Sequence, residues 1–296
     1  MTDSSQFAGT ILAVVTRSLL QVAESKGLPG DELLAAAGLV RADIASPDAY
    51  LPIERHVALG VAMTERMGRV NGGLHSGVAI FGDPRGALGF AIRRSGVHGR
   101  ALTQFARFLS IINDSLRLSV QPAAEGVSVC VEMVPSLEAL GHPTEALFSA
   151  WVSIARFATG VRWAPERVLF RHAPWGPASE HREFFACPVE FGAPRSELVI
   201  GSANLLLAIE PKAHPFDAVV DRLERHLLTA AAAPRAAVIA LTAALRAGPL
   251  ATGAGHPPAL LIDAARFASE AALPAFETAF LLGFAGVREL AAELGR

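Results

Sequence analysis

Apolar residues recur at helical spacing through the first quarter of the chain. Between Phe7 and Lys26 they fall on one face of a helix. That face consists of Ile11, Val14, Val15, Leu19, Leu20 and Val22. Residues 27–30 (Gly-Leu-Pro-Gly) are expected to end this helix, and a short helix follows over 32–37. Pro52 suits the first turn of a third helix that reaches about Met67, so the pattern predicts a small, helical N-terminal segment.

After residue 115 the spacing of apolar residues changes from helical to alternating. Apolar residues occupy every second position over 116–120 and 127–131, on either side of a Pro- and Gly-containing stretch, which predicts a β-hairpin with one buried face. Further short strands are expected at 168–171 and 196–200. The helices expected around them cover residues 87–94, 99–113, 145–159 and 180–185. Strands interleaved with helices in this way predict an α+β fold.

Glycine and proline mark the expected breaks. Gly72-Gly73 and residues 82–86 are predicted to be loops, and residues 248–258 form the strongest linker. From Pro215 onward the chain is predicted to be entirely helical. The expected helices of this tail cover residues 217–231, 236–246, 259–269, 274–283 and 287–294.

Composition limits the classes of function. A chain of 296 residues, of which 51% are apolar, can bury a large core in two domains or three small ones. The net charge of −2 gives no overall attraction to nucleic-acid phosphate, so DNA binding requires a local basic patch. Residues 235–296 provide no such excess, because five bases oppose five acids there. The bases are Arg235, Arg246, Arg266, Arg288 and Arg296, and the acids are Asp263, Glu270, Glu277, Glu289 and Glu293.

The histidines and cysteines, which could act as metal ligands or nucleophiles, do not have the spacing of a catalytic or metal site. His172, His181 and His214 lack the spacing of metal ligands, and we interpret them as structural or surface histidines. Cys130 and Cys187 are far apart and are expected to be ordinary buried thiols in a reducing cytoplasm. Dinucleotide-binding, Walker and GxSxG motifs do not occur, so no catalytic, cofactor-binding or metal-binding residue is assigned. The N-terminus has no secretory signal pattern, and no apolar run reaches the length of a membrane span.

A specific motif occupies residues 182–200, Arg-Glu-Phe-Phe-Ala-Cys-Pro-Val-Glu-Phe-Gly-Ala-Pro-Arg-Ser-Glu-Leu-Val-Ile. It resembles a signature of the effector-sensing domain in AraC-type transcription regulators, in the branch named for an arabinose-binding-type N-terminal domain. Similar elements occur in the expected order at residues 29–38, 50–53, 86–92, 99–102 and 168–172. The resemblance covers about residues 8 to 230 and implies a domain that senses a small molecule. The motif itself holds no reactive group and is typical of packing.

The tail resembles the same family in part. Residues 276–284 (Phe-Glu-Thr-Ala-Phe-Leu-Leu-Gly-Phe) resemble the first helix of the second helix-turn-helix unit, which in the family leads into a basic recognition helix. Here the matching stretch, 285–294, carries Glu289 and Glu293 where basic residues are expected. Arg288 is its one base and therefore the candidate DNA contact. The recognition helix of the first unit has no counterpart, since residues 244–258 are rich in Gly and Pro.

The chain is accordingly divided into an effector-sensing domain over 1–230 and a shortened or degenerate helix-turn-helix-like tail over 235–296. Three functions remain open: a small-molecule-responsive regulator, an effector- or partner-binding protein that has lost autonomous DNA binding, and an enzyme that uses the sensor cavity. The last has no nucleophile–base set to support it, so we expect no enzyme. A cytoplasmic homodimer is expected, with Leu223, Leu227 and Leu228 either at the dimer face or packed within the protomer. The effector and its pocket residues are not predictable.

Overall fold

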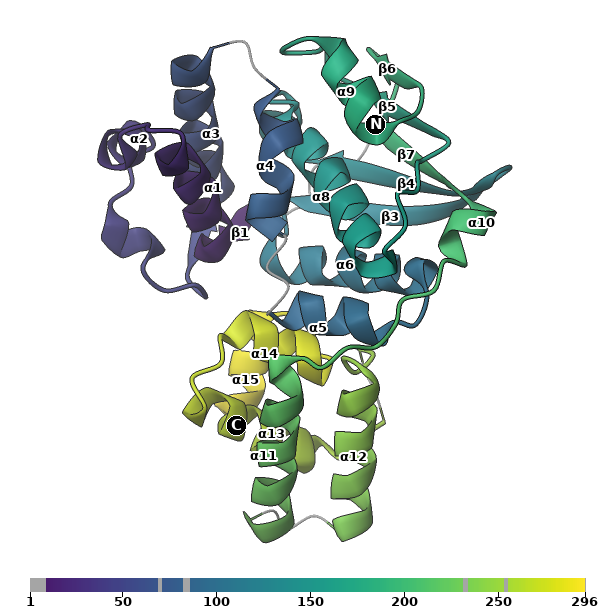
Figure 1. Ribbon diagram of the computed structural model, residues 1–296. Helices are drawn as coiled ribbons and strands as arrows, with labels where there is room; N and C mark the ends of the chain where they lie inside the picture. The colour runs from purple at the N-terminus through teal and green to yellow at the C-terminus, as the bar shows by residue number, and fades with distance from the viewer. Residues whose placement is uncertain (1–8, 69–70, 82–85, 231–233, 253–254, 296) are drawn as a thin grey trace.

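The computed structural model describes residues 9–68, 71–81, 86–230, 234–252 and 255–295. Its N-terminal part joins two short antiparallel strands to helices, as Figure 1 shows. Their bounds are β1 Thr10–Leu12, α1 Ala13–Ser25, α2 Gly30–Ala36, a 3₁₀ helix at Arg41–Ile44, β2 Tyr50–Pro52 and α3 Ile53–Met67. The prediction of a helix from residue 7 is wrong for β1, because Ile11 pairs with Leu51. Residues 7 and 8 lie outside the described ranges.

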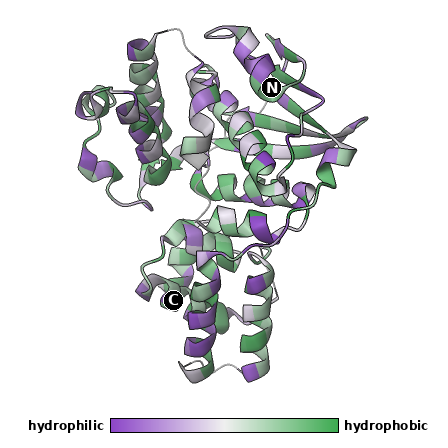
Figure 2. Ribbon diagram, in the orientation of Figure 1, coloured by the Kyte–Doolittle hydropathy of each residue, from purple (hydrophilic) through white to green (hydrophobic). Residues whose placement is uncertain are grey.

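A five-stranded sheet forms the middle of the molecule. The strands are β3 Leu116–Ala123, β4 Gly126–Met133, β5 Arg167–Phe170, β6 Val189–Phe191 and β7 Glu197–Gly201, in the order β3-β4-β7-β5-β6. Pairing is antiparallel except between β5 and β6. Figure 2 shows that the strands are largely hydrophobic. The predicted hairpin and the α+β class are confirmed, but Val120, near the tip of edge strand β3, is 41% exposed rather than buried.

Helices pack on the sheet and on one another. They are α4 Gly72–Phe81, α5 Ala87–Arg94, α6 His98–Ile112, α7 Pro135–Glu138, α8 His142–Thr159, α9 Ala178–Phe185 and α10 Ser202–Leu205. Helix α8 lies across the sheet in Figure 1 and presses Phe148 against Phe170, with ring centres 5.8 Å apart. The segment that carries the 182–200 motif packs on the same aromatic residue, since the rings of Phe191 and Phe170 are stacked at 5.3 Å. The motif is therefore a packing element, as expected from its composition.

Helix α4 begins where a loop was predicted. Gly72 and Gly73 are its first residues, so the loop prediction is wrong for them. The reason is the close approach of α8: a Cβ atom at Gly73 would lie 2.3 Å from the carbonyl oxygen of His142, and one at Gly77 would lie 2.1 Å from that of Ala146. Glycine allows the two helix backbones to touch. Most of the second predicted loop, 82–86, lies outside the described residues.

The tail is all-helical, as predicted. It consists of α11 Pro215–Ala230, α12 Arg235–Ala247, α13 Pro258–Glu270, α14 Ala275–Leu282 and α15 Val287–Leu294. These helices share a second hydrophobic cluster, in which Leu223 and Leu227 of α11 are buried, whereas Leu228 is 41% exposed. Two of the three leucines considered for a dimer face therefore pack within the protomer. Across the described residues, no helix is long and apolar enough to span a membrane.

Helix α14 connects the tail to the rest of the molecule. Its Phe276 and Phe280 belong to the main core and meet Phe108 of α6 edge-on, with ring centres 6.0 and 5.3 Å apart. Its Ala279 and Leu282 belong to the tail cluster. The segment 276–284 that resembles a helix-turn-helix element is thus the junction between the two cores, which lies beside α5 in Figure 1.

Candidate functional site

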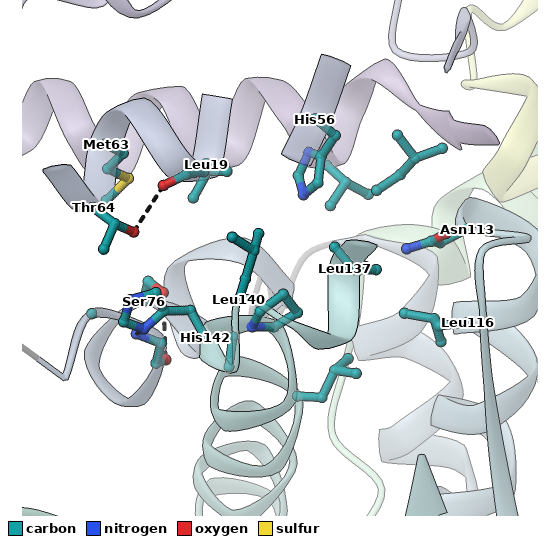
Figure 3. Close-up of a pocket in the computed structure, with 18 of the residues that line it drawn as sticks. Leu19, His56, Met63, Thr64, Ser76, Asn113, Leu116, Leu137, Leu140 and His142 are labelled. Carbon is teal, nitrogen blue, oxygen red and sulfur yellow. Dashed lines mark hydrogen bonds between the residues drawn. The ribbon is translucent and has the colours of Figure 1, made fainter. Parts of the chain in front are cut away.

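A pocket opens between α1, α3, α4 and the start of α8. Counted together with the open solvent at its mouth, the atom-free space is about 820 Å³. Figure 3 shows α3 above this space and Leu140, His142 and Ser76 below it. Most lining side chains are apolar: Ile11, Val15, Leu19, Met63, Met67, Leu116, Leu137, Leu140, Pro143, Ala146 and Leu147. A mostly apolar lining with a few polar groups is typical of small-molecule sites.

Few polar side chains reach the pocket, and two hydroxyl groups among them are already engaged. Thr64 Oγ1 donates to the Gly60 carbonyl at 2.8 Å, and Ser76 Oγ donates to the Gly73 carbonyl at 3.4 Å. At the opposite end Asn113 Oδ1 accepts a hydrogen bond from the Ser115 amide at 2.9 Å. This bond assigns the amide orientation, so the side-chain nitrogen of Asn113 points into the space, as Figure 3 shows.

His56 hangs from α3 into the middle of the pocket. Its Nδ1 lies 3.0 Å from the hydroxyl oxygen of Thr16, which orients the ring. Burial lowers the pKa of His56 to about 4, because an imidazolium ion would lose its hydration among apolar neighbours. The ring is therefore neutral near pH 7 and acts as a hydrogen-bonding group rather than as a cation.

A buried carboxylate lies directly behind the pocket. Glu145 is fully buried, and its Oε1 lies 2.9 Å from His181 Nε2 and 3.8 Å from His172 Nε2. The pocket residue His142 places Nδ1 3.6 Å from Glu145 Oε2. Burial by itself raises the pKa of Glu145, but the nearby His142, the hydrogen bond with His181 and the charges of His181 and His172 outweigh it and lower that pKa to about 2. The cluster fixes α8 against α9 and orients the pocket wall at His142.

The structure therefore brings together two of the three histidines that the sequence singled out. His172 and His181 meet at Glu145, whereas His214 packs between Phe90 and Phe216 elsewhere. No group of three or more His, Cys, Asp or Glu residues has metal-binding geometry in the described ranges. Of the two thiols, Cys130 is buried as expected, but Cys187 is partly exposed. Its pKa is raised to about 11 by burial, so it is not a reactive thiolate.

Arg288, the candidate DNA contact, lies on α15 against the N-terminal part. Its guanidinium carbon is 4.3 Å from the centre of the Tyr50 ring, and Nη2 donates to Thr10 Oγ1 at 3.3 Å. Nη1 lies 3.8 Å from Asp114 Oδ2. The side chain is still 60% exposed, so these contacts hold it without burying it. The other charged residues of α15, Glu289 and Glu293, are acidic, and the described part of this helix has no basic face.

A family model described as the arabinose-binding domain of AraC transcription regulators, N-terminal, matches residues 27–209. The chain belongs to this family. It is an AraC-type transcription regulator with an arabinose-binding-type domain, and most of the pocket lies inside the matched residues. The tail helices α11 to α15 lie beyond them.

Among solved structures, the transcriptional regulator CdpR from Pseudomonas aeruginosa is similar to this AraC-type chain. The two are 14% identical, and the TM-score is 0.47 over 94% of this chain and 93% of that one. The search of curated proteins found no match.

The sequence missed the residues that build the pocket of this AraC-type chain. His56, Asn113 and His142 come from three separate segments: His56 and His142 lie in helices, Asn113 lies in an isolated β-bridge, and none belongs to a local motif. Nothing in their spacing signals a shared site, because the fold alone brings them together. The motif at 182–200, which carried the resemblance, contributes no lining residue.

Proposed function

We propose that this AraC-type regulator binds a small molecule in the pocket under α3 and that the bound molecule alters how its tail is held. The proposal is supported by one pair of backbone segments, around residues 11 and 113, that contributes both to the pocket wall and to the contacts that hold Arg288 of the tail. Ile11 and Asn113 line the pocket and form a β-bridge with each other. Their sequence neighbours Thr10 and Asp114 hold Arg288 of α15.

The segments at 10 and 114 are also bonded to each other. Asp114 accepts hydrogen bonds from the backbone amide and the hydroxyl group of Thr10, each at 2.6 Å. A ligand that displaces Ile11 or Asn113 therefore displaces a connected unit and not one side chain. We consider an equilibrium between a docked tail, with Arg288 held by Thr10 and Asp114, and an undocked tail. A ligand shifts this equilibrium to the extent that its affinities for the two arrangements differ.

For this function we keep the division into an effector-sensing part, 1–230, and a helix-turn-helix-like tail, 235–296, with α11 packed on the tail. Helices α14 and α15 with the turn between them have the order of a helix-turn-helix, and Arg288 is the proposed contact to DNA phosphate or base. A homodimer would present two such tails to a two-fold site.

The test measures DNA binding by the full chain to the region upstream of its own gene. Fluorescence anisotropy at low and moderate salt, with and without compounds that stabilise the protein in a thermal screen, should show a ligand-dependent change in affinity. A pocket-filling variant, Gly60→Leu, should lose the ligand response and keep the affinity of the ligand-free protein. Absence of binding at low salt with every stabilising compound would eliminate DNA binding by this chain alone.

A second candidate is a protein that binds an effector or a partner without contacting DNA by itself. It is favoured by the acidic character of α15, where Glu289 and Glu293 follow a single base, Arg288, that contacts Tyr50. Sedimentation of the protein with labelled upstream DNA, with and without its thermal-screen ligands, separates the two candidates. The second candidate requires ligand or partner binding with no DNA affinity at any salt concentration. The distinction lies in the tail and not in the pocket.

A further inference from the structure

The chemistry of the pocket indicates which molecules it takes. We infer that the effector is an uncharged, elongated and mostly apolar molecule with one hydrogen-bond acceptor, to which the side-chain nitrogen of Asn113 donates. The inference rests on the proposed effector role of the pocket and adds the chemical class of the ligand.

The first argument is the unused donor of Asn113. This residue is only 6% exposed, and its Oδ1 accepts a hydrogen bond from the Ser115 amide. Its side-chain nitrogen faces the pocket, and no described residue accepts a hydrogen bond from it. A molecule that fills the pocket removes water from this donor, which costs free energy unless the molecule supplies a hydrogen-bond acceptor. The donor lies beside Leu116 and Leu137, so the acceptor belongs to a molecule whose remaining surface is apolar.

The second argument is the absence of full charge on the described lining. The described residues that line the pocket include no Lys, Arg, Asp or Glu, and His56 is neutral near pH 7. An ionised carboxylate or ammonium group placed there would lose hydration without a counter-charge on the described lining, because Glu145 lies behind the wall and is already surrounded by histidines, and this loss is strongly unfavourable. Charged side chains, Lys26 and Glu180, instead line a separate hollow that shares only Met67 and Gly72 with the pocket.

The third argument is shape. The donor of Asn113 is at one end, His56 is in the middle, and Thr64 and Ser76 are at the other end, as Figure 3 shows. The hydroxyl groups of Thr64 and Ser76 already donate hydrogen bonds to backbone carbonyl groups, so toward a ligand they can act only as acceptors. Between the ends the walls are Leu, Met, Ile and Val side chains, which favour a chain or a flat ring system over a sugar-like molecule with many hydroxyl groups.

The experiment compares four probes that share a ten-carbon chain by isothermal titration with the full chain: 2-decanone, n-decane, decanoate and decyltrimethylammonium. The ketone should bind at least about tenfold more tightly than either ion, because the ions must be desolvated without a partner. It should also bind more tightly than the alkane, because it satisfies Asn113. Tighter binding of decanoate or of the cation than of the ketone would overturn the inference.

Two variants locate the binding. Asn113→Asp keeps the acceptor for the Ser115 amide but removes the donor, so it should weaken 2-decanone about tenfold and leave decane unchanged. Gly60→Leu should abolish binding of both, since a Cβ at Gly60 already lies 3.3 Å from Leu140 Cδ1 and the longer side chain fills the space. The neighbouring change Val61→Leu, outside the lining, is the control. Equal loss of ketone and alkane in Asn113→Asp would contradict the role of the donor.

The inference and the proposed function fail in different ways. If the ketone binds as described but DNA affinity never responds to it, the ligand class stands and the regulatory role fails. If a charged metabolite stabilises the protein, and Gly60→Leu removes that stabilisation, the pocket remains an effector site and the inferred class is wrong.

Discussion

The guanidinium group of Arg288 stacks on the ring of Tyr50, with its central carbon 4.3 Å from the ring centre. Arg288 is the base of α15 that the sequence marked as a DNA contact, and Tyr50 is the first residue of β2 in the N-terminal part. A guanidinium group held on an aromatic face and beside Asp114 is not available to a phosphate in the same position. The contact with Tyr50 therefore links the docking of the tail to the proposed role of Arg288 in DNA binding.

Tyr50→Leu should raise DNA affinity. The substitution removes the aromatic face but keeps an apolar side chain, and an exposed cation–π contact contributes about 0.5–1 kcal/mol, equivalent to about two- to fivefold in affinity. Anisotropy with labelled upstream DNA measures the gain. The double variant Tyr50→Leu/Arg288→Ala is the control and should lose it. A gain that persists without Arg288 would show that the stacking is not what restrains DNA binding.

Asp48→Ala should loosen the whole tail. The two carboxylate oxygens of Asp48 accept hydrogen bonds from the backbone amides of Ala275 and Phe276, at 2.9 and 3.0 Å, and so cap α14 from the N-terminal part. Loss of a capping carboxylate at a helix N-terminus costs about 1–2 kcal/mol. Urea unfolding measures the loss, and limited proteolysis should cut near residues 248–258 sooner.

The control for Asp48 is Asp31→Ala, which removes another aspartate from a first helical turn. Asp31 pairs with Arg41, and its side chain is 80% exposed, so the change should cost less than about 0.5 kcal/mol. Equal effects of the two substitutions would mean that the cap from Asp48 does not stabilise the junction.

Local sequence patterns predicted the helices and strands of this fold well, but they did not predict how these elements contact one another. The alternation at 116–131 gave the hairpin its correct pairing, and α15 was predicted at its observed bounds, because periodicity within one element reports which face is buried. Gly72 and Gly73 were misread because glycine marks both a loop and a close helix contact, and only the position of α8 distinguishes these. The pocket escaped prediction since Asn113 and His56 become neighbours only in three dimensions.

Stability should fall as the pH drops from about 6.5 toward 4. Burial lowers the pKa of His56 from 6.5 to about 4, so between these values the unfolded chain binds a proton that the folded chain does not. Stability from the neutral ring is therefore present above pH 6.5 and is lost as the pH falls through this window. With allowance for the opening of the pocket to solvent, the loss is about 2 kcal/mol.

Comparison with His56→Gln isolates this contribution, since glutamine does not titrate. Urea unfolding of both proteins at pH 7 and 4.5 should give a smaller decrease for the variant. Burial also lowers the pKa of His98 and of His172, but these rings are common to both proteins and cancel in the difference. Glu145, with its pKa lowered to about 2, loses its contribution only below about pH 4.5. Parallel pH dependence of the two proteins would contradict the neutral state of His56.

Gly77→Ala should be strongly destabilising, whereas Gly72→Ala should not. A methyl group at Gly77 would lie 2.1 Å from the Ala146 carbonyl oxygen and 2.5 Å from Ser149 Oγ, so α4 and α8 must separate, at a cost of about 3 kcal/mol. At Gly72 the nearest atoms, on His142 and Met67, are 3.9 Å away. Alanine there restricts the unfolded chain and should change stability by less than about 1 kcal/mol, in the favourable direction. Because α4 also carries Ser76 of the pocket wall, Gly77→Ala should weaken pocket ligands as well as lower the melting temperature. If both alanine variants melted alike, the close contact between α4 and α8 would not be what requires glycine at residue 77.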